Sequence, residues 1–130
     1  MEVQLVSPEQ VLYAGAADMV ICRTLGGGEI AFLDNHAPFL GALDAWPVRL
    51  VLADGAQETF AVHGGFVEVG NNRCIILSDV AELADQIDVE RAQQSKAEAE
   101  DALRTNPDDA DAVAQLRRAE TRLMVAGVNA

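Results

Sequence analysis

The chain changes its sequence pattern near residue 80. Before that point, short apolar and β-branched runs alternate with turn-forming residues, and after it an Ala/Glu/Arg-rich stretch runs to Gly127 without another glycine. The first pattern is typical of strands and the second of helices. The sequence therefore predicts two modules in one small chain: a mainly β N-terminal sandwich or flattened barrel over 1–83, followed by a C-terminal α-helical hairpin over 84–130.

Turn signals divide the first module into segments about 8 to 12 residues apart, a spacing typical of an all-β sandwich or barrel. The residue types of Asp54-Gly55 tolerate positive φ, so segments 48–53 and 57–63 are expected to pair as an antiparallel hairpin. The apolar run at 74–77 is expected to be buried on both faces. The turn signals are Ser7-Pro8, Gly26-Gly27-Gly28, Asp34-Asn35, Trp46-Pro47, Asp54-Gly55, Gly64-Gly65 and Gly70-Asn71-Asn72.

Two helices are expected in the second module. Asp88 is placed to cap the start of the first helix, and Arg104 lies near its end, where a cation complements the helix dipole. Thr105-Asn106-Pro107 ends this helix, and a second is expected from about Asp108 to Ala126. Few large apolar residues are available between the helices, so burial at about 25 cal/mol per Å² stabilises the hairpin by only a few kcal/mol. The hairpin is therefore either fixed on the sandwich or able to undock.

Charge and composition exclude several functions. The net charge of −12 makes nucleic acid or an anionic membrane surface an unexpected partner. No apolar stretch approaches about 18 residues, and Met1 leads directly into a predicted strand, so neither membrane insertion nor a targeting peptide is expected. Cys22 and Cys74 lie in apolar runs without metal-ligand spacing, and they are expected to be buried free thiols in a reducing compartment.

The sequence contains no recognisable catalytic or metal-binding constellation. His36 and His63 are the two histidines, and neither has a nucleophile-elbow or triad-like context. His63 is interpreted as a polar residue at a strand end beside the Gly64-Gly65 turn, and His36 as a turn or interface residue. Gly26-Gly27-Gly28 is followed neither by Lys-Ser/Thr nor by a helix, so it is not a phosphate-binding loop.

Five segments, in order over nearly the whole chain, resemble the epsilon subunit of rotary F-type ATP synthases. They are SPEQVLYAGAADMVICRT (7–24), GEIAFLDNHAPFL (28–40), VHGGFVEVGNN (62–72), ILSDVAE (76–82) and IDVERA (87–92). The resemblance implies a non-catalytic central-stalk subunit that couples rotation to ATP synthesis and to proton or sodium translocation. Its sandwich would contact the gamma subunit and the c-subunit ring, on the cytoplasmic side of the bacterial plasma membrane.

The resemblance also implies which residues face the c ring. Gly28-Glu29-Ile30 and His36-Ala37-Pro38 match the strand and loop that lie near the polar loops of the ring in the family, so Glu29 and His36 are candidate contact residues. The alternative for Glu29 is a solvated charge at a strand end. Ala31 departs from the Gly that is common in the family at its position, which bears on how tightly this strand bends.

In the family the hairpin is regulatory. Folded against the sandwich it permits ATP hydrolysis, and extended along gamma toward the alpha and beta subunits it inhibits hydrolysis. Bound ATP holds the folded hairpin in some bacterial members. The resemblance therefore implies ATP, with magnesium as its companion ion, as a regulatory ligand here, and no cofactor is required. A motif of the form Ile/Leu-Asp-x-x-Arg-Ala begins the first helix in these members, and Ile87-Asp88-Val89-Glu90-Arg91-Ala92 matches it in full.

A candidate ATP site follows from this match. Asp88 can accept hydrogen bonds from an adenine amino group or a ribose, and Arg91 can face phosphate or stack on the base. Glu98 occupies a position where the best ATP binders carry Arg, so an anion here is expected to weaken binding by about 1 kcal/mol or more. The candidate residues are Glu82, Ile87, Asp88, Arg91, Ala92, Arg118 and Arg122.

Other interpretations stay open. Asp88 could act only as a helix N-cap, with Arg91 and Arg118 paired to carboxylates such as Glu90 or Glu120 and Arg122 solvated. For the whole chain, the alternative to a stalk subunit is a stand-alone β-sandwich binding module with a helical tail, which would show no affinity for gamma. An enzyme comes third and would require an activity that depends on one of the histidines.

Overall fold

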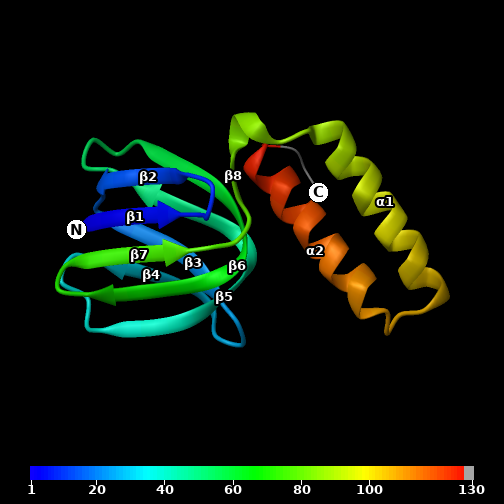
Figure 1. The fold of residues 1–130 in the computed structure, drawn as a ribbon, viewed down its shortest axis with the longest axis horizontal. Helices are drawn as coiled ribbons and strands as arrows, with labels where there is room; N and C mark the ends of the chain where they lie inside the picture. The colour runs from blue at the N-terminus through cyan, green and yellow to red at the C-terminus, as the bar shows by residue number, and fades with distance from the viewer. Residues whose placement is uncertain (128–130) are drawn as a thin grey trace.

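The computed structural model describes residues 1–127 and shows a β module followed by two packed helices (Figure 1). This arrangement confirms the expected fold class. Val128, Asn129 and Ala130, the end of the expected hairpin module, lie outside the described residues. The elements are β1 (Glu2–Val6), β2 (Val11–Ala16), β3 (Met19–Thr24), β4 (Gly28–Leu33), β5 (Phe39–Val51), β6 (Gln57–Gly70), β7 (Arg73–Leu77), β8 (Ala81–Leu83), the 3₁₀ turn η1 (Ala84–Gln86), α1 (Val89–Thr105) and α2 (Ala110–Val125).

The strands form one folded sheet in the order β2-β1-β7-β6-β5-β3-β4, with β8 paired to β6 off this path. The β1–β7 pair is parallel and the other pairs are antiparallel. The backbone N–H of Asn35 donates to the side chain of Asn72 at 2.9 Å, which joins the loop after β4 to the turn before β7. The sheet thus folds over into a flattened barrel with its hydrophobic side inward (Figure 1).

The hairpin predicted around Asp54-Gly55 is confirmed, because β5 and β6 pair up to Val51 opposite Gln57. The turn predicted at Trp46-Pro47 is wrong, since both residues lie inside β5. The register between β3 and β5 shifts between Ile21 and Thr24, leaving this part of β5 without direct β3 partners. Proline lacks a backbone donor, so it fits a strand at such an irregularity.

The turn predicted at Gly64-Gly65 is also wrong, because β6 continues through it. Gly64 and Gly65 have φ values of +89° and +117°, and β6 changes partner here. It pairs with β8 before the two glycines and with β7 after them. A Cβ on Gly65 would lie 2.1 Å from the carbonyl oxygen of Leu77, so only glycine lets the chain between β7 and β8 cross β6 this closely.

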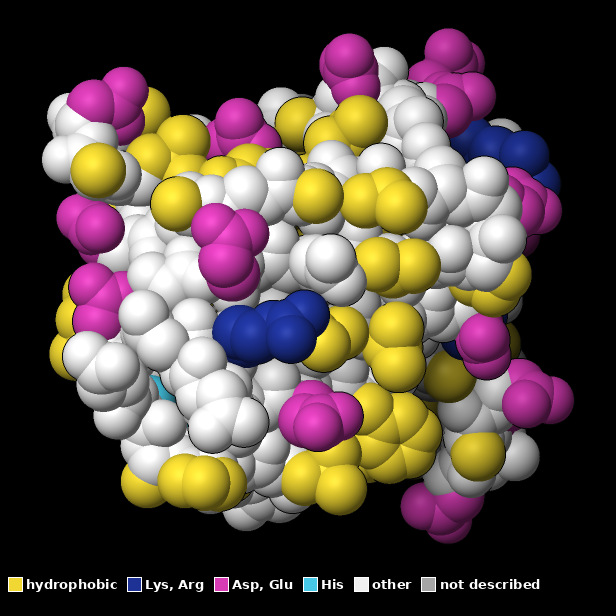
Figure 2. Space-filling view, turned by 60° about the vertical axis from the view of Figure 1, so that its left-hand side comes forward, with side chains coloured by type: hydrophobic (Ala, Val, Ile, Leu, Met, Phe, Trp, Pro, Cys, Tyr) yellow, Lys and Arg dark blue, Asp and Glu magenta, His cyan; other side chains and the backbone are white. Residues whose placement is uncertain are grey.

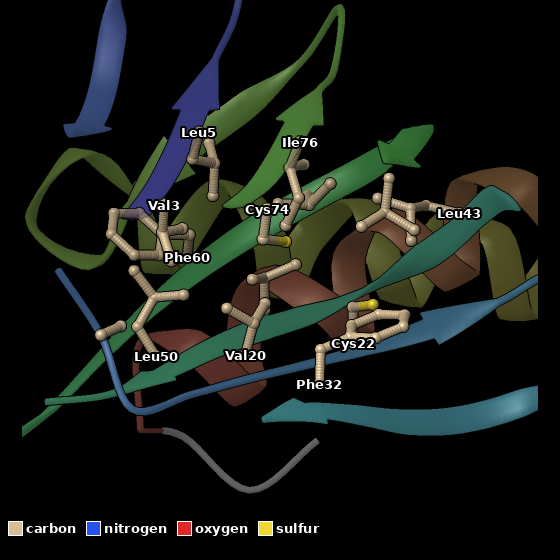
Figure 3. Close-up of a cluster of buried hydrophobic side chains, with 14 of the residues drawn as sticks. Val3, Leu5, Val20, Cys22, Phe32, Leu43, Leu50, Phe60, Cys74 and Ile76 are labelled. Atoms are coloured by element: carbon tan, nitrogen blue, oxygen red, sulfur yellow. The ribbon is translucent and has the colours of Figure 1, made fainter. Parts of the chain in front are cut away.

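The core lies between the two layers of the folded sheet (Figure 3). Cys22 and Cys74 are among its buried side chains, which confirms the expected free thiols, and burial raises the pKa of each to about 12. The expectation that 74–77 is buried on both faces is wrong. Cys74 and Ile76 point into the core, whereas Leu77 is 53% exposed, because β7 has only one face against the core.

The helices pack as a hairpin with α2 lying between the sandwich and α1 (Figure 1). Asp88 caps α1 by accepting from the N–H of Arg91 at 3.1 Å, as expected, and Asp109 caps α2, so the second helix begins two residues later than expected. The buried residues of α1 are both alanines, Ala92 and Ala99. The larger buried side chains of the hairpin lie near the end of α2, whose buried residues are Ala112, Ala119, Thr121, Leu123 and Val125. No helix within residues 1–127 is long and apolar enough to cross a membrane.

Candidate functional site

A polar cavity of about 430 Å³ lies where β8, the start of α1 and the second half of α2 meet. Its volume is in the range of small-molecule sites, and charged or polar side chains form most of its lining. Six of the seven predicted ATP-site residues line it; Ile87 does not. The lining residues are Glu82, Gln86, Asp88, Arg91, Ala92, Ser95, Gln115, Arg118 and Arg122.

Helical periodicity explains why these side chains converge. On α1, Arg91 and Ser95 are four residues apart, and on α2, Gln115, Arg118 and Arg122 follow one another at spacings of three and four. Such spacings place side chains on one face of a helix. The side-chain amide of Gln115 donates to the carbonyl oxygen of Ser95 at 3.0 Å, which fixes the two faces against each other.

Glu82 connects the sandwich to the hairpin. Its Oε1 accepts from Nε of Arg122 at 2.7 Å and from Nε2 of His63 at 2.9 Å. Burial raises the pKa of Glu82, but the hydrogen bonds from Arg122 and His63 outweigh burial, so the net pKa lies below its ordinary value. Burial lowers the pKa of His63, whose side chain is 2% exposed. At neutral pH the site therefore holds an ionised Glu82 and a neutral His63.

His63 was not expected in this position. Because β6 continues through Gly64-Gly65, the imidazole lies inside a long strand and faces the hairpin rather than ending a strand at a turn. The interpretation of Arg122 as a solvated charge is likewise wrong, since its guanidinium pairs with Glu82.

Arg91 and Arg118 present charge to the cavity. Within residues 1–127 neither forms an ion pair, so pairing with Glu90 or Glu120 does not occur in this structure. The N-cap role of Asp88 is confirmed, and it occupies one carboxylate oxygen. The second oxygen of Asp88 is left to accept from a ligand.

Glu98 lies outside the cavity lining. It is exposed on α1 and accepts from the side chain of Gln94 at 3.4 Å. A charge in this position acts on a bound anion through solvent, where salt screens it. The weakening of ATP binding by Glu98 is therefore expected to be near the lower limit given above, about 1 kcal/mol.

A second polar contact between hairpin and sandwich was missed from the sequence. Arg117 of α2 donates to Oδ2 of Asp44 on β5 at 2.6 Å. Arg23 of β3 approaches the same oxygen at 3.8 Å and stacks over the ring of Trp46, with its guanidinium carbon 4.6 Å from the ring centroid. These partners come from distant parts of the chain, and no local motif marks them.

The two predicted c-ring contacts lie at opposite ends of β4. Glu29, 45% exposed, accepts from Nε1 of Trp46 at 2.9 Å and from Arg49 at 3.3 Å. His36 follows the strand, and its ring packs edge-on against Phe32 with centroids 4.8 Å apart. The structure thus does not bring Glu29 and His36 into one cluster, and their contact role stays a prediction.

An exposed apolar row was also missed from the sequence. Val11, Leu77 and Phe66 are 61%, 53% and 58% exposed, and they lie on β2, β7 and β6. The register aligns Val11 with Val6, Val6 with Leu77, and Leu77 with Phe66, so the four side chains form one row across the outer face. Figure 2 shows hydrophobic side chains gathered on one face of the molecule among acidic ones. We call Val6, Val11, Phe66 and Leu77 the apolar row.

Together these features describe a β-sandwich with an exposed apolar row, which carries a helical hairpin with a polar, arginine-lined cavity at its base. The family described as the ATP synthase delta/epsilon chain β-sandwich domain matches residues 1–84. The family described as its long α-helix domain matches residues 85–127.

Curated relatives agree with both matches. The ATP synthase epsilon chain of Streptomyces griseus is 39% identical over 128 residues, covering 98% of this chain and 96% of the relative. The epsilon chain of Symbiobacterium thermophilum is 43% identical, covering 98% and 93%. The chain therefore belongs to the epsilon chain family of ATP synthases, and it is a non-catalytic central-stalk subunit of that complex.

Solved structures share the fold at lower identity. A chain in the Euglena gracilis mitochondrial ATP synthase (OSCP, F1 and c-ring) has a TM-score of 0.72 at 20% identity, covering 96% of this chain and 76% of that chain. A chain in the Tetrahymena thermophila mitochondrial ATP synthase central stalk and c-ring has a TM-score of 0.60 at 19% identity, covering 98% and 92%. At this identity the likeness concerns the fold.

Proposed function

We propose that the hairpin of this stalk subunit is a regulatory element that ATP holds in its docked position. The observation that carries the proposal is the pair of arginines, Arg91 on α1 and Arg118 on α2, which face one cavity without an ion-pair partner among residues 1–127. Guanidinium groups bind phosphate oxygens through charge-assisted hydrogen bonds. A triphosphate between them would join the two helices.

The rest of the cavity suits the other parts of ATP. Arg122 already pairs with Glu82, and this pair offers a donor and an acceptor beside Arg91 and Arg118. The free oxygen of Asp88 and the carboxylate of Glu82 can accept from an adenine amino group or from ribose. Ala92, 3% exposed, keeps the cavity wall close to the backbone of α1. Because such a ligand contacts β8, α1 and α2 together, it stabilises the docked hairpin by RT ln(1 + [L]/Kd).

Magnesium would arrive with the nucleotide rather than occupy a protein site. Residues 1–127 contain no group of three His, Cys, Asp or Glu side chains placed to hold a metal ion. Glu82 is engaged by Arg122 and His63. Binding of ATP is therefore expected with or without magnesium.

Isothermal titration of the whole chain with MgATP, and with ATP in excess chelator, tests the proposal. Arg91→Ala, and Arg118→Ala combined with Arg122→Ala, should each weaken binding by about tenfold or more, since a hydrogen bond to a charged group contributes about 1.5–3 kcal/mol. Arg104→Ala is the matched control, because Arg104 pairs with Asp101 outside the cavity. Unchanged affinity in the double variant, with the sandwich still folded, would remove the site assignment.

We further propose a division of roles between a sandwich domain, 1–83, and a regulatory hairpin, 84–130. The apolar row fits the gamma subunit, because exposed apolar surface of this kind marks protein contacts. Glu29 and His36 would face the c-subunit ring, and the extended hairpin would reach the alpha and beta subunits, with the protein peripheral to the cytoplasmic side of a bacterial plasma membrane. Co-purification with gamma tests this, and the absence of any affinity for gamma would favour a stand-alone binding module.

A further inference from the structure

The ring of His63 lies where sandwich, connector and hairpin meet. Its Nε2 donates to Glu82 of β8, while its Nδ1 is buried and has no hydrogen-bond partner among residues 1–127. On the hairpin side, the imidazole borders a second cavity of about 650 Å³ between β5, β6 and the first half of α2. A neutral imidazole fits this position, because its Nδ1 then carries a lone pair rather than a proton that needs an acceptor.

Charged groups reach this ring from several elements. Glu82 contacts it from β8, and Arg118 and Arg122 of α2 act on it electrostatically. Around the second cavity lie Asp44 of β5, Asp108 of the turn between the helices, and Arg117 of α2. Arg117 and Asp44 form an ion pair with each other, so much of their effect on the ring cancels. Docking of α2 thus brings the cations Arg118 and Arg122 toward His63 and removes water from its ring.

We propose that His63 is a proton-operated release for the hairpin, so that protonation of its Nδ1 weakens the docking of α2 on the sandwich. A protonated ring in the docked state would carry a buried N–H without an acceptor, which is a costly arrangement. It would also place a second cation beside Arg122, since both side chains already donate to the same oxygen of Glu82. In the undocked state water can solvate Nδ1, and Glu82 on the neighbouring strand remains as a partner for the imidazolium.

The direction of the pH effect follows from linkage. Burial in the docked state lowers the pKa of His63 from its ordinary 6.5, so the docked state binds the proton less readily than the undocked state. Docking therefore weakens on acidification, and its equilibrium constant falls by up to tenfold for each pH unit between the undocked-state pKa and the lower docked-state pKa.

The chain contains its own reporter of docking. Trp46 is the single tryptophan, and it borders a cavity shared with Arg117, Glu120, Thr121 and Met124 of α2. Release of the hairpin exposes this ring to solvent. Quenching of its fluorescence by acrylamide therefore measures the docking of the full chain, and it is recorded without nucleotide so that the result does not depend on the ATP site.

We expect the quenching constant of the wild type to rise between pH 7.5 and 5.5. His63→Gln keeps a donor for Glu82 but does not titrate, so this rise should be lost. His36→Gln, the matched control at the other histidine, should retain it. A constant that stays flat in the wild type, or that rises equally in His63→Gln, would overturn the proposal.

A second variant covers the case in which His63→Gln does not fold at pH 8, as judged by circular dichroism. Arg118→Gln removes one cation that lowers the pKa of His63 in the docked state. The amplitude of the pH-dependent rise should then decrease, and the NMR titration of the His63 ring should move to higher pH. An amplitude that stays unchanged while the His63 titration moves would show that another group controls the release and would overturn the proposal.

Discussion

Replacement of Gly65 by alanine should destabilise the whole sandwich. A side chain at φ +117° costs about 1–3 kcal/mol in backbone strain. The new Cβ would lie 2.1 Å from the carbonyl oxygen of Leu77 and 2.9 Å from Cα of Ser78, and both are backbone atoms that cannot rotate away. Moving them disturbs the hydrogen bond from the Ser78 hydroxyl to the Gly64 carbonyl, 2.7 Å long. Overpacking of this kind adds about 1–3 kcal/mol.

The expected loss is thus about 2–6 kcal/mol, a large part of the roughly 5–15 kcal/mol by which domains are stable. Urea unfolding followed by circular dichroism measures it. Gly70→Ala is the matched control on the same strand, since a Cβ there meets nothing within 4 Å. It should leave stability unchanged or raise it by about 0.4–1 kcal/mol through the unfolded state. The reasoning is refuted if the two variants unfold at similar urea concentrations.

Three further predictions concern the surface, the thiols and the titrating pair. Phe66→Ser should weaken binding to gamma by about tenfold or more, which binding to surface-captured gamma measures. Because Phe66 is 58% exposed, the free energy of unfolding, measured in urea, should change by less than about 1 kcal/mol. Cys22 and Cys74, whose pKa values burial raises to about 12, should react with Ellman's reagent at pH 8 only as the chain unfolds. The free energy of unfolding should fall in two stages on acidification, below the ordinary pKa of His63 at 6.5 and again below that of Glu82 at 4.5, because both pKa values are lowered in the folded chain; thermal melts between pH 8 and pH 3 measure this.

Each of these has a contrary result. If Leu33→Ser, which alters an exposed leucine on β4 outside the apolar row, weakened gamma binding as much as Phe66→Ser, the row would not be the docking surface. Thiols that react within the dead time in folded protein would contradict the burial of both cysteines. A stability that stays level down to pH 5 would show that His63 has the same pKa in folded and unfolded chains.

The sequence predicted which helical side chains lie together better than it predicted the turns within the sandwich. The arginines converge because spacings of three and four determine which face of a helix carries them, and this spacing can be counted in a sequence. The cap at Asp88 is equally local. The family resemblance supplied the pairing of these helical faces with the connector, which spacing alone does not provide.

The missed features all depend on contacts between distant segments. Gly64-Gly65 has the composition of a turn, and only the crossing of the chain between β7 and β8 explains why two positive φ values occur inside a strand. The ion pair of Arg117 with Asp44 joins residues that are 73 positions apart. The exposure of Leu77 depends on which strands and helices cover β7. Such features follow from tertiary packing and leave no periodic signal.

Hydrogen exchange of the whole chain, with and without saturating MgATP, tests most directly whether ATP holds the hairpin docked. The account predicts that amides of α1 and α2 gain protection in proportion to 1 + [L]/Kd, while amides of the sandwich core change little. Arg91→Ala should abolish the gain. Equal protection of the helices in the presence and absence of MgATP, at concentrations where titration shows binding, would contradict the account.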